Sequence, residues 1–423
     1  MTGSSPATVR LPRSSGQTEL KPLSFCDMET LSDERTQTLR RLLKEGHNSV
    51  APLRDPKLIL HSHLPHLLGS AYALGASSDL LQKCYDQETS NLKNIDEGFI
   101  RGDKISKETW RNFLADKTYT VAYVDYFDEE IKKKDGDWKS VLNEYLYAGT
   151  EPIINGHTGG LGHPFIHLAY AYEYQSKGVA SEALSMGCTE YFPLHGLIDY
   201  PSPDTSTYKT QSLADVIERV RTDSRFDGLL TVPGITNFDP ILKQHFVTVV
   251  EHWNAWEVVD TVQQFEQLCD LSVLLAISDG DPEKSFDFYH VHLMTICHAL
   301  RVIWQEFPAD RQVALLRQYG LFAILIYVAQ LRSHFGMEGI EAVKTEGRDW
   351  TWVTKTALAH KWVLDAHFFK VVRAPKVFSE TYGEKNDFYL KAAIKFLTEF
   401  RGWEGFGFGV EGYDPSVDGY IPK

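Results

Sequence analysis

The sequence has 423 residues, 43% of them hydrophobic and 12% aromatic, so the chain can bury a large apolar core. Its formal net charge of −14 repels phosphate backbones and argues against nucleic-acid binding. The five cysteines lie far apart without a CxxC pair, which predicts reduced thiols; with neither a secretion signal nor an apolar run of about 18 residues, we expect a cytoplasmic protein without a membrane span.

In chain order, residues 1–22 are polar and rich in Ser, Pro and Gly, which predicts a flexible tail. Beyond them, apolar residues recur at helical spacing, most clearly in 67–74, 121–131, 165–172, 258–273 and 315–329. Strand-like alternation is scarce, and turn signals such as SPDTS and DGDPE separate the helical segments. The sequence therefore predicts an all-α fold, with one large multi-helix domain over residues 23–423.

The last part of that domain, residues 403–423, is a tail rich in glycine and aromatic residues that cannot hold a regular helix. Two interpretations stay open. The tail is either a loose end, or a strap that lays Trp403, Phe406 and Phe408 over a hydrophobic site.

Most of the sixteen histidines fall on four apolar, helix-like segments, which read HSHLPHLL, GHTGGLGHPFIHL, HVHLMTICHAL and LAHKWVLDAHFFK. Within them, His63 and His66 are three residues apart, and His163 and His167 are four apart. Each pair shares one helix face with large apolar residues, so these imidazoles should point inward, where their nitrogen atoms need partners. A single such histidine is most often a core residue bonded to a carbonyl, but four inward-facing groups favour a shared metal ion, for which imidazole suits iron, zinc, copper or nickel.

Lys370 is three residues from His367 and shares its predicted inward face. A buried lysine is costly as a cation. Its neutral amine could act as a base, or it could take up CO2 to form a carbamate that binds a metal as a carboxylate does. Alternatively, Lys370 pairs with Asp365 or reaches out to solvent.

Four stretches together resemble the fungal questin oxidase-like family: HSHLPHLLGSAYALGA, GGLGHPFIHLAYAYE, HLMTICHAL and DAHFFKVVRA. The resemblance runs from about residue 50 to about residue 405, with two departures. Leu67 stands where family members often have a second histidine after His66, and Met294 stands where they usually have valine. The resemblance implies oxidative ring opening of an anthraquinone-type polyketide to a benzophenone, with the anthraquinone and O2 as partners.

We therefore expect a non-heme iron(II) dioxygenase of fungal secondary metabolism, whose metal is held by His66, His167, His292, His367 and Lys370, the last as its carbamate. His63 and His163 are expected as catalytic residues that orient the ligands or pass protons, and as the next candidates for ligands.

Two alternatives to the iron enzyme remain. The first is an NADPH-dependent Baeyer–Villiger-type monooxygenase on the same substrates, although no GxGxxG follows a strand. The second is a non-catalytic protein that carries an aromatic ligand. Neither the oligomeric state nor the particular anthraquinone is predicted.

Overall fold

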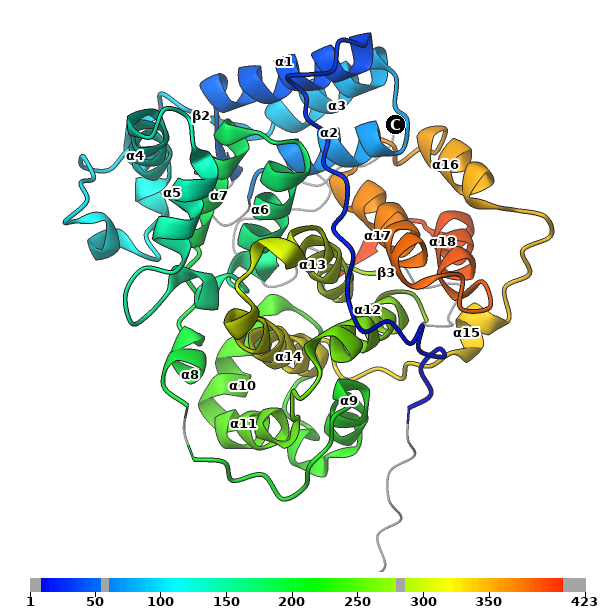
Figure 1. Ribbon diagram of the computed structural model, residues 1–423. Helices are drawn as coiled ribbons and strands as arrows, with labels where there is room; N and C mark the ends of the chain where they lie inside the picture. Colours follow the sequence, from blue (N-terminus) through cyan, green and yellow to red (C-terminus); the bar gives the residue numbers. More distant parts are fainter. Residues whose placement is uncertain (1–8, 55–60, 202, 279–285, 406–423) are drawn as a thin grey trace, which may run out of the picture.

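The computed structural model describes residues 9–54, 61–201, 203–278 and 286–405, and in these ranges the chain folds into eighteen α-helices with little sheet (Figure 1). The expectation of an all-α, multi-helix fold is confirmed. The α-helices are α1 (Glu34–Ser49), α2 (Leu64–Ala73), α3 (Ser78–Thr89), α4 (Thr120–Lys133), α5 (Trp138–Leu146), α6 (His163–Glu173), α7 (Lys177–Thr189), α8 (His195–Asp199), α9 (Leu213–Thr222), α10 (Phe238–Gln244), α11 (Phe246–Ala255), α12 (Thr261–Ile277), α13 (His290–Ile303), α14 (Gln312–Ala329), α15 (Glu338–Glu341), α16 (Trp350–Leu358), α17 (Ala366–Tyr382) and α18 (Phe388–Glu399).

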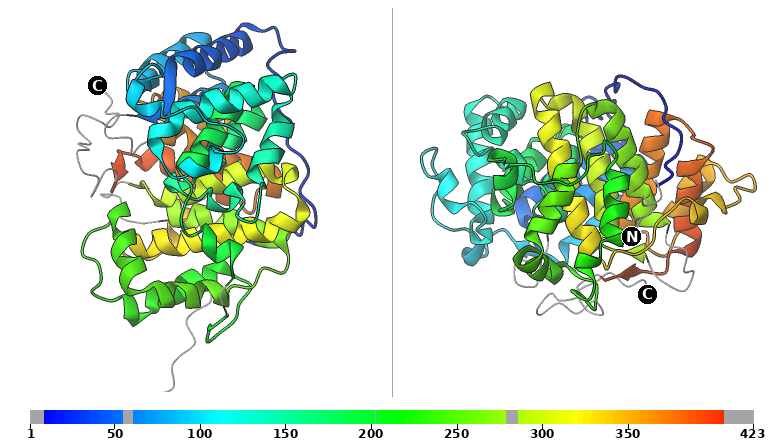
Figure 2. Two further views of the ribbon diagram at one scale, coloured as in Figure 1. Left: turned by 90° about the vertical axis from the view of Figure 1, so that its left-hand side faces the viewer. Right: turned by 90° about the horizontal axis from the view of Figure 1, so that it is seen from below.

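Short 3₁₀ helices and two small strand pairs complete the described structure. The 3₁₀ helices are η1 (Gly98–Ile100), η2 (Trp110–Phe113), η3 (Lys117–Tyr119), η4 (Ile153–Gly156), η5 (Gly160–Gly162), η6 (Ser224–Phe226), η7 (Ile235–Asn237), η8 (Trp304–Glu306) and η9 (Ala309–Arg311). Strand β1 (Val50–Arg54) pairs antiparallel with β2 (Leu92–Asn94), and β3 (Phe286–Asp287) pairs in parallel with β4 (Trp403–Glu404). Figure 2 shows β4 at the edge of the molecule in both views.

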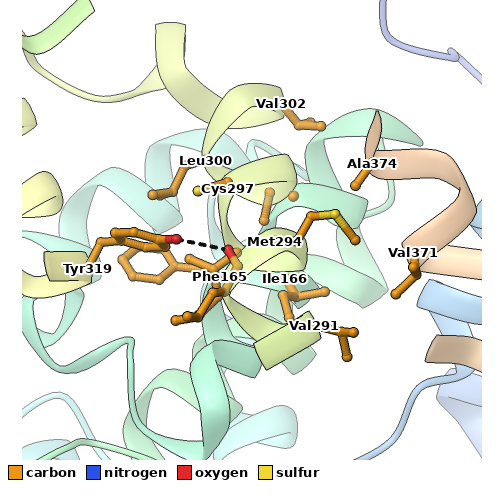
Figure 3. Close-up of a cluster of buried hydrophobic side chains, with 14 of the residues drawn as sticks. Phe165, Ile166, Val291, Met294, Cys297, Leu300, Val302, Tyr319, Val371 and Ala374 are labelled. Carbon is orange, nitrogen blue, oxygen red and sulfur yellow. Dashed lines mark hydrogen bonds between the residues drawn. The ribbon is translucent and has the colours of Figure 1, made fainter. Parts of the chain in front are cut away.

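Helix α13 lies at the centre of the fold, and every residue from His290 to Ile303 is buried. A helix that is apolar on all sides has no face for solvent and must be surrounded by other elements. Here it packs against α6, α12, α14 and α17. Figure 3 shows side chains of three of these neighbours around it: Phe165 and Ile166 of α6, Tyr319 of α14, and Val371 and Ala374 of α17.

Two of the histidine-bearing helices, α2 and α6, begin with a proline in the first turn and without a capping side chain. Several helices start at an Asp or Ser side chain that accepts a backbone N–H, as Asp33 does for α1 and Asp365 for α17. Helices α2 and α6 have no such cap and carry proline in the first turn instead. Their first turns hold His66 and His163, two of the predicted site residues.

The segment expected as an N-terminal tail is described from residue 9 onward. There it has no helix or strand and runs across the front of the molecule in the view of Figure 1. Leu20 is buried, Ser15 donates its backbone N–H to Glu266 of α12 (2.6 Å), and Arg301 of α13 donates to the carbonyl of Lys21 (2.7 Å). These contacts tie residues 14–21 to the helical body.

One expectation about apolar runs is wrong. Among the described residues, the stretch Ala309–Ala329 is long and apolar enough to cross a membrane, but 78% of its apolar window is buried inside the protein. Most of this stretch is α14, whose neighbours α9, α10, α11, α12 and α13 cover it. The apolar residues of this stretch therefore form part of the protein core.

Trp403 of the C-terminal tail lies in β4 and packs against rings of the core. Its ring centroid is 4.6 Å from that of Phe400 and 6.0 Å from those of Phe288 and His367. This contact agrees with the strap interpretation as far as Trp403. Phe406 and Phe408 lie outside the described residues.

Candidate functional site

The four histidine segments meet near the middle of the fold. Helix α2 packs against α6 and α17, and α13 packs against the same two helices, so four elements far apart in sequence surround one place (Figure 1). All seven predicted site residues are buried there: His63, His66, His163, His167, His292, His367 and Lys370.

The tightest group consists of His63, His163 and His367. Each offers a ring nitrogen, and these nitrogen atoms all lie within 4.8 Å of one another. Nε2 of His63 and Nε2 of His163 are 2.8 Å apart, a separation that suits either a hydrogen bond or two ligands of one ion. His63 and His163 were expected to be catalytic residues, and the structure places them in the tightest group of potential metal ligands.

His163 and His292 are oriented as metal-binding imidazoles usually are. His163 donates from Nδ1 to the carbonyl of Gly160 (2.6 Å), and His292 donates from Nδ1 to the carbonyl of Phe288 (2.7 Å). A neutral ring that donates from Nδ1 keeps its lone pair on Nε2. That Nε2 of His292 lies 3.2 Å from Nε2 of His367, so His292 adjoins the group of three.

His66 and His167 form a row that leads from the centre to Glu182. Nε2 of His66 is 3.2 Å from Nδ1 of His167, and Nε2 of His167 is 2.9 Å from a carboxylate oxygen of Glu182. Both nitrogen atoms of His167 are therefore occupied by protein partners. By contrast, Nδ1 of His66 is buried and has no hydrogen-bonding partner among the described residues.

The rings around this centre are held in their neutral form. Burial, followed by the positive charge of neighbouring groups, above all Lys370, keeps the pKa of His66 and His292 well below the usual range for histidine. Burial, followed by the charge of neighbouring histidines and of Lys370, also lowers the pKa of His63, His163 and His367. Neutral imidazole is the form that binds a metal ion, so the site needs no deprotonation there before it can take one.

Lys370 is 1% exposed, and its Nζ has no hydrogen-bonding partner among the described residues. Burial lowers its pKa to about 7, even though the charges of Asp365 and Glu88 oppose that shift. Asp365 itself accepts hydrogen bonds from the backbone N–H of Phe368 (2.7 Å) and from Nε1 of Trp403 (3.1 Å). Of the two alternatives to a metal-linked role, reaching out to solvent is wrong, and the described residues contain no hydrogen bond between Lys370 and Asp365.

A cavity of about 250 Å³ adjoins the histidine centre, and His63 and His163 form part of its wall. Most of its lining is apolar or aromatic, from Leu161, Phe192, Ile235, Phe238, Phe288, Tyr289 and Phe322. Its polar wall carries Arg54, Lys117, His61 and Glu190. An apolar slot with a few charged groups beside buried histidines is the usual form of a small-molecule site.

The sequence did not single out the polar wall. Glu190, the residue that follows α7, accepts hydrogen bonds from Nε2 of His61 and from the ammonium group of Lys117. The ring of His61 stacks on that of His163, with centroids 4.5 Å apart. His61 stands in the first histidine segment and could have been named, but no local pattern marks Glu190 or Lys117 as its partners.

Two other buried histidines of the same four segments contact groups outside the centre. His157 donates from Nδ1 to the carbonyl of Ile153 (2.8 Å), and the ring of His290 lies beside that of Tyr327 (6.1 Å). The fold therefore selects among histidines that the sequence groups together.

Residues 60–375 match the family described as questin oxidase-like. The chain belongs to this family. An oxidoreductase of Aspergillus parasiticus, AflY, is 23% identical over 383 residues, which cover 86% of this chain and 74% of the relative. The Baeyer–Villiger oxidase mdpL of Emericella nidulans is 22% identical over 393 residues, or 84% of each chain. A questin oxidase of Aspergillus fumigatus is 23% identical over 314 residues, or 66% of each chain.

These relatives confirm the expectation of an oxygenase-type oxidoreductase, and the family match confirms the resemblance of the four histidine stretches.

Proposed function

We propose that the protein is an iron(II)-dependent dioxygenase that cleaves a C–C bond of an anthraquinone-type polyketide in fungal secondary metabolism, acting in the cytoplasm. One observation carries the proposal: three buried imidazoles have nitrogen atoms within 4.8 Å of one another beside an aromatic-lined cavity. The questin oxidase among the relatives supports the substrate class.

The residues of the centre fit such an ion. We assign His63, His163 and His367 as the nearest ligands, with His66 and His292 next to them. His167, expected as a ligand from the sequence, instead holds His66. Bound iron(II) would supply single-electron transfer between O2 and an electron-rich aromatic ring.

Lys370 completes the set in this proposal. Its amine has a pKa of about 7, so a large share of it is neutral at that pH and can attack CO2. The new N–C bond yields a carbamate anion and releases a proton, and the buried ammonium is replaced by an oxygen donor. Together with the histidines, this oxygen donor would complete the set of side chains that hold the ion.

The cavity supports a flat polycyclic substrate. Phenylalanine rings such as Phe238 and Phe322 offer stacking surfaces, and the apolar walls exclude water from the reacting ring. Arg54 and Lys117 place positive charge on the wall that also holds His63 and His163. An ionised phenol of the substrate would be stabilised there, and ionisation makes the ring electron-rich.

Metal analysis and oxygen consumption test this function on the purified protein, with questin as the substrate. We expect about one iron ion per chain, because these donors surround a single place. Turnover should be lost with a chelator, restored by iron(II) and independent of NADPH. Full activity in the presence of chelator with an absolute need for NADPH would favour the Baeyer–Villiger-type monooxygenase named among the relatives. Tight questin binding without oxygen consumption would favour a carrier.

A matched pair of variants controls for unfolding. His63→Gln removes one of the nearest donors and should lower the iron content, whereas His298→Gln changes another buried histidine, on α13, outside the centre and should retain iron. Equal iron content in the two variants would contradict the assignment of His63.

A further inference from the structure

A row of hydrogen-bonded side chains joins the centre to the surface through helices α6, α7, α1 and α4. Behind His66 and His167, Glu182 of α7 uses its second oxygen to accept a hydrogen bond from Nδ1 of His47 (2.7 Å). His47 lies on α1 and donates its other N–H, at Nε2, to Asp128 of α4 (2.9 Å).

The two ends of this row lie in different surroundings. The side chain of Asp128 is 42% exposed and that of His47 is 15% exposed, and both line a surface pocket of about 930 Å³. His167 and His66 are fully buried. Glu182 stands between them, a carboxylate that is nine-tenths buried and has a histidine on each oxygen.

The fold makes room for this arrangement. Gly178 lies in the first turn of α7, and a Cβ atom built on it would lie only 3.0 Å from Cγ of His47. A side chain at position 178 would require the His47 ring to shift, so glycine favours the close approach of α7 to this ring. Glu182 follows Gly178 by four residues, on the same helix face, so the glycine allows contact between His47 and Glu182.

The charges in the row set the direction of each hydrogen bond. Burial alone would lower the pKa of His47, but the hydrogen bonds to Asp128 and Glu182 outweigh it and raise the pKa to about 10. Burial alone would raise the pKa of Glu182, but the hydrogen bonds from His167 and His47 lower it to about 2. At neutral pH, Glu182 is therefore an anion that only accepts, and His47 is a cation that donates from both nitrogens.

From this anion inward, each proton position follows from the previous one. His167 must carry its proton on Nε2 to donate to Glu182, which leaves a lone pair on Nδ1 when the ring is neutral. That lone pair can accept only if His66 carries its proton on Nε2. His66 then has a lone pair on Nδ1, the buried atom that has no partner among the described residues.

We propose that Glu182, held by His47 and Asp128, is a positioning residue that sets the tautomers of His167 and His66, so that His66 offers an unprotonated Nδ1 to the metal centre. The proposal rests on the proposed function only for the identity of the ion. In this arrangement His167 orients His66 and does not bind the ion itself. Glu182, His47 and Asp128 belong to the site as positioning residues and do not touch the substrate or the ion.

Nitrogen-15 NMR of the metal-free, histidine-labelled full chain tests the tautomers directly, because protonated and unprotonated ring nitrogens have distinct shifts. In the wild type we expect His66 and His167 both protonated at Nε2. Glu182→Gln should move the proton of His167 to Nδ1, because His47 needs the amide oxygen and leaves the amide N–H₂ to face His167. Glu182→Asp, which keeps an acceptor for both rings, should retain the wild-type tautomers.

Asp223→Asn is the matched control, because Asp223 is another largely buried carboxylate that is bonded to a histidine, His252, away from the centre. It should leave the signals of His66 and His167 unchanged. A wild-type spectrum with His66 protonated at Nδ1 would overturn the proposal without any variant, so it stays testable even if Glu182→Gln fails to fold. Unchanged tautomers in a folded Glu182→Gln variant would overturn it as well.

Metal titration provides a second readout that does not depend on turnover. Partners that orient a ligand usually contribute about 10–100-fold to metal affinity, so we expect Glu182→Gln to bind iron(II) about tenfold or more weakly, and Asp223→Asn to bind it as the wild type does. If Glu182→Gln bound iron(II) as tightly as the wild type does, the proposed link between Glu182 and the metal centre would be wrong. If the wild type binds no iron at all, the proposed function fails, while the tautomers measured without metal still decide the role of Glu182.

Discussion

Lys370 shows what a single residue contributes to this site. Its amine is buried among neutral imidazoles, and its charge adds to the effect of burial, which is the main cause of the lowered pKa values of His66 and His292. Because its pKa is lower in the folded chain than in the unfolded chain, such a lysine lowers the free energy of unfolding of the metal-free protein at every pH at which the unfolded chain binds its proton. Its retention in the core therefore has to be explained by the chemistry of the centre and not by stability.

Lys370→Met should stabilise the metal-free protein in a pH-dependent manner. The folded pKa of about 7 lies below the usual 10.5, so between these values the unfolded chain binds more protons, and the wild type gains stability as the pH rises. At about 1.4 kcal/mol per pH unit, the gain of the variant over the wild type is about 5 kcal/mol larger at pH 7 than at pH 10.5. Urea denaturation in CO2-free buffer measures the difference.

That experiment has an internal control, because the packing change from lysine to methionine is the same at every pH. The gain should stay constant below pH 7 and shrink steadily above it. A difference that does not vary with pH would mean that the amine of Lys370 is paired or hydrated in the folded protein.

At the scale of the elements, the start of α6 decides where His163 points. Gly162 precedes the helix with a φ of +75°, in the left-handed region, and a Cβ on it would clash with the side chain of Ile296 on α13. The backbone of η5 can therefore turn into α6 directly against α13. The carbonyl of Gly160 in that turn accepts the Nδ1 proton of His163.

Gly162→Ala should destabilise the protein more than Gly136→Ala. Both glycines have positive φ, which costs about 1–2 kcal/mol with a side chain. Only Gly162 also faces a packed neighbour, which adds about 1–3 kcal/mol, whereas a Cβ on Gly136 meets nothing within 4 Å. Urea denaturation measures both variants, and equal losses would show that α6 and α13 can move apart without cost.

At the scale of the whole molecule, the centre ties together parts of the chain that are otherwise far apart. Its candidate ligands come from α2, α6, α13 and α17. The N-terminal segment contacts α13 and α17, and β4 contacts α17. An ion bound there would link all four helices in the folded state and none in the unfolded state. Metal binding and global stability should therefore be coupled.

Adding iron(II) to the metal-free protein under anaerobic conditions should raise its melting temperature. An ion present at about a hundred times its dissociation constant adds about 2.7 kcal/mol to the free energy of unfolding. Differential scanning calorimetry measures the shift. The double variant His63→Gln/His163→Gln should show none, and a shift of wild-type size in it would place the ion elsewhere.

Much of this architecture can be predicted from the sequence, because helical spacing is a local property. Apolar residues three and four positions apart predict the helices, and the same spacing correctly places the pairs His63–His66, His163–His167 and His367–Lys370 on inward faces. The four histidine stretches likewise indicate the family that the comparisons confirm.

Only the tertiary structure decides which of these histidines meet, because packing between distant helix faces sets those contacts. His63 and His163 are a hundred residues apart in the chain, yet their Nε2 atoms lie 2.8 Å apart, whereas His157 and His290 turn to other partners. The carboxylates Glu182 and Glu190 become partners of His167 and His61 through the packing of α7 against its neighbours. Residue types and their spacing thus determine what chemistry the chain can carry, while long-range packing determines which atoms carry it.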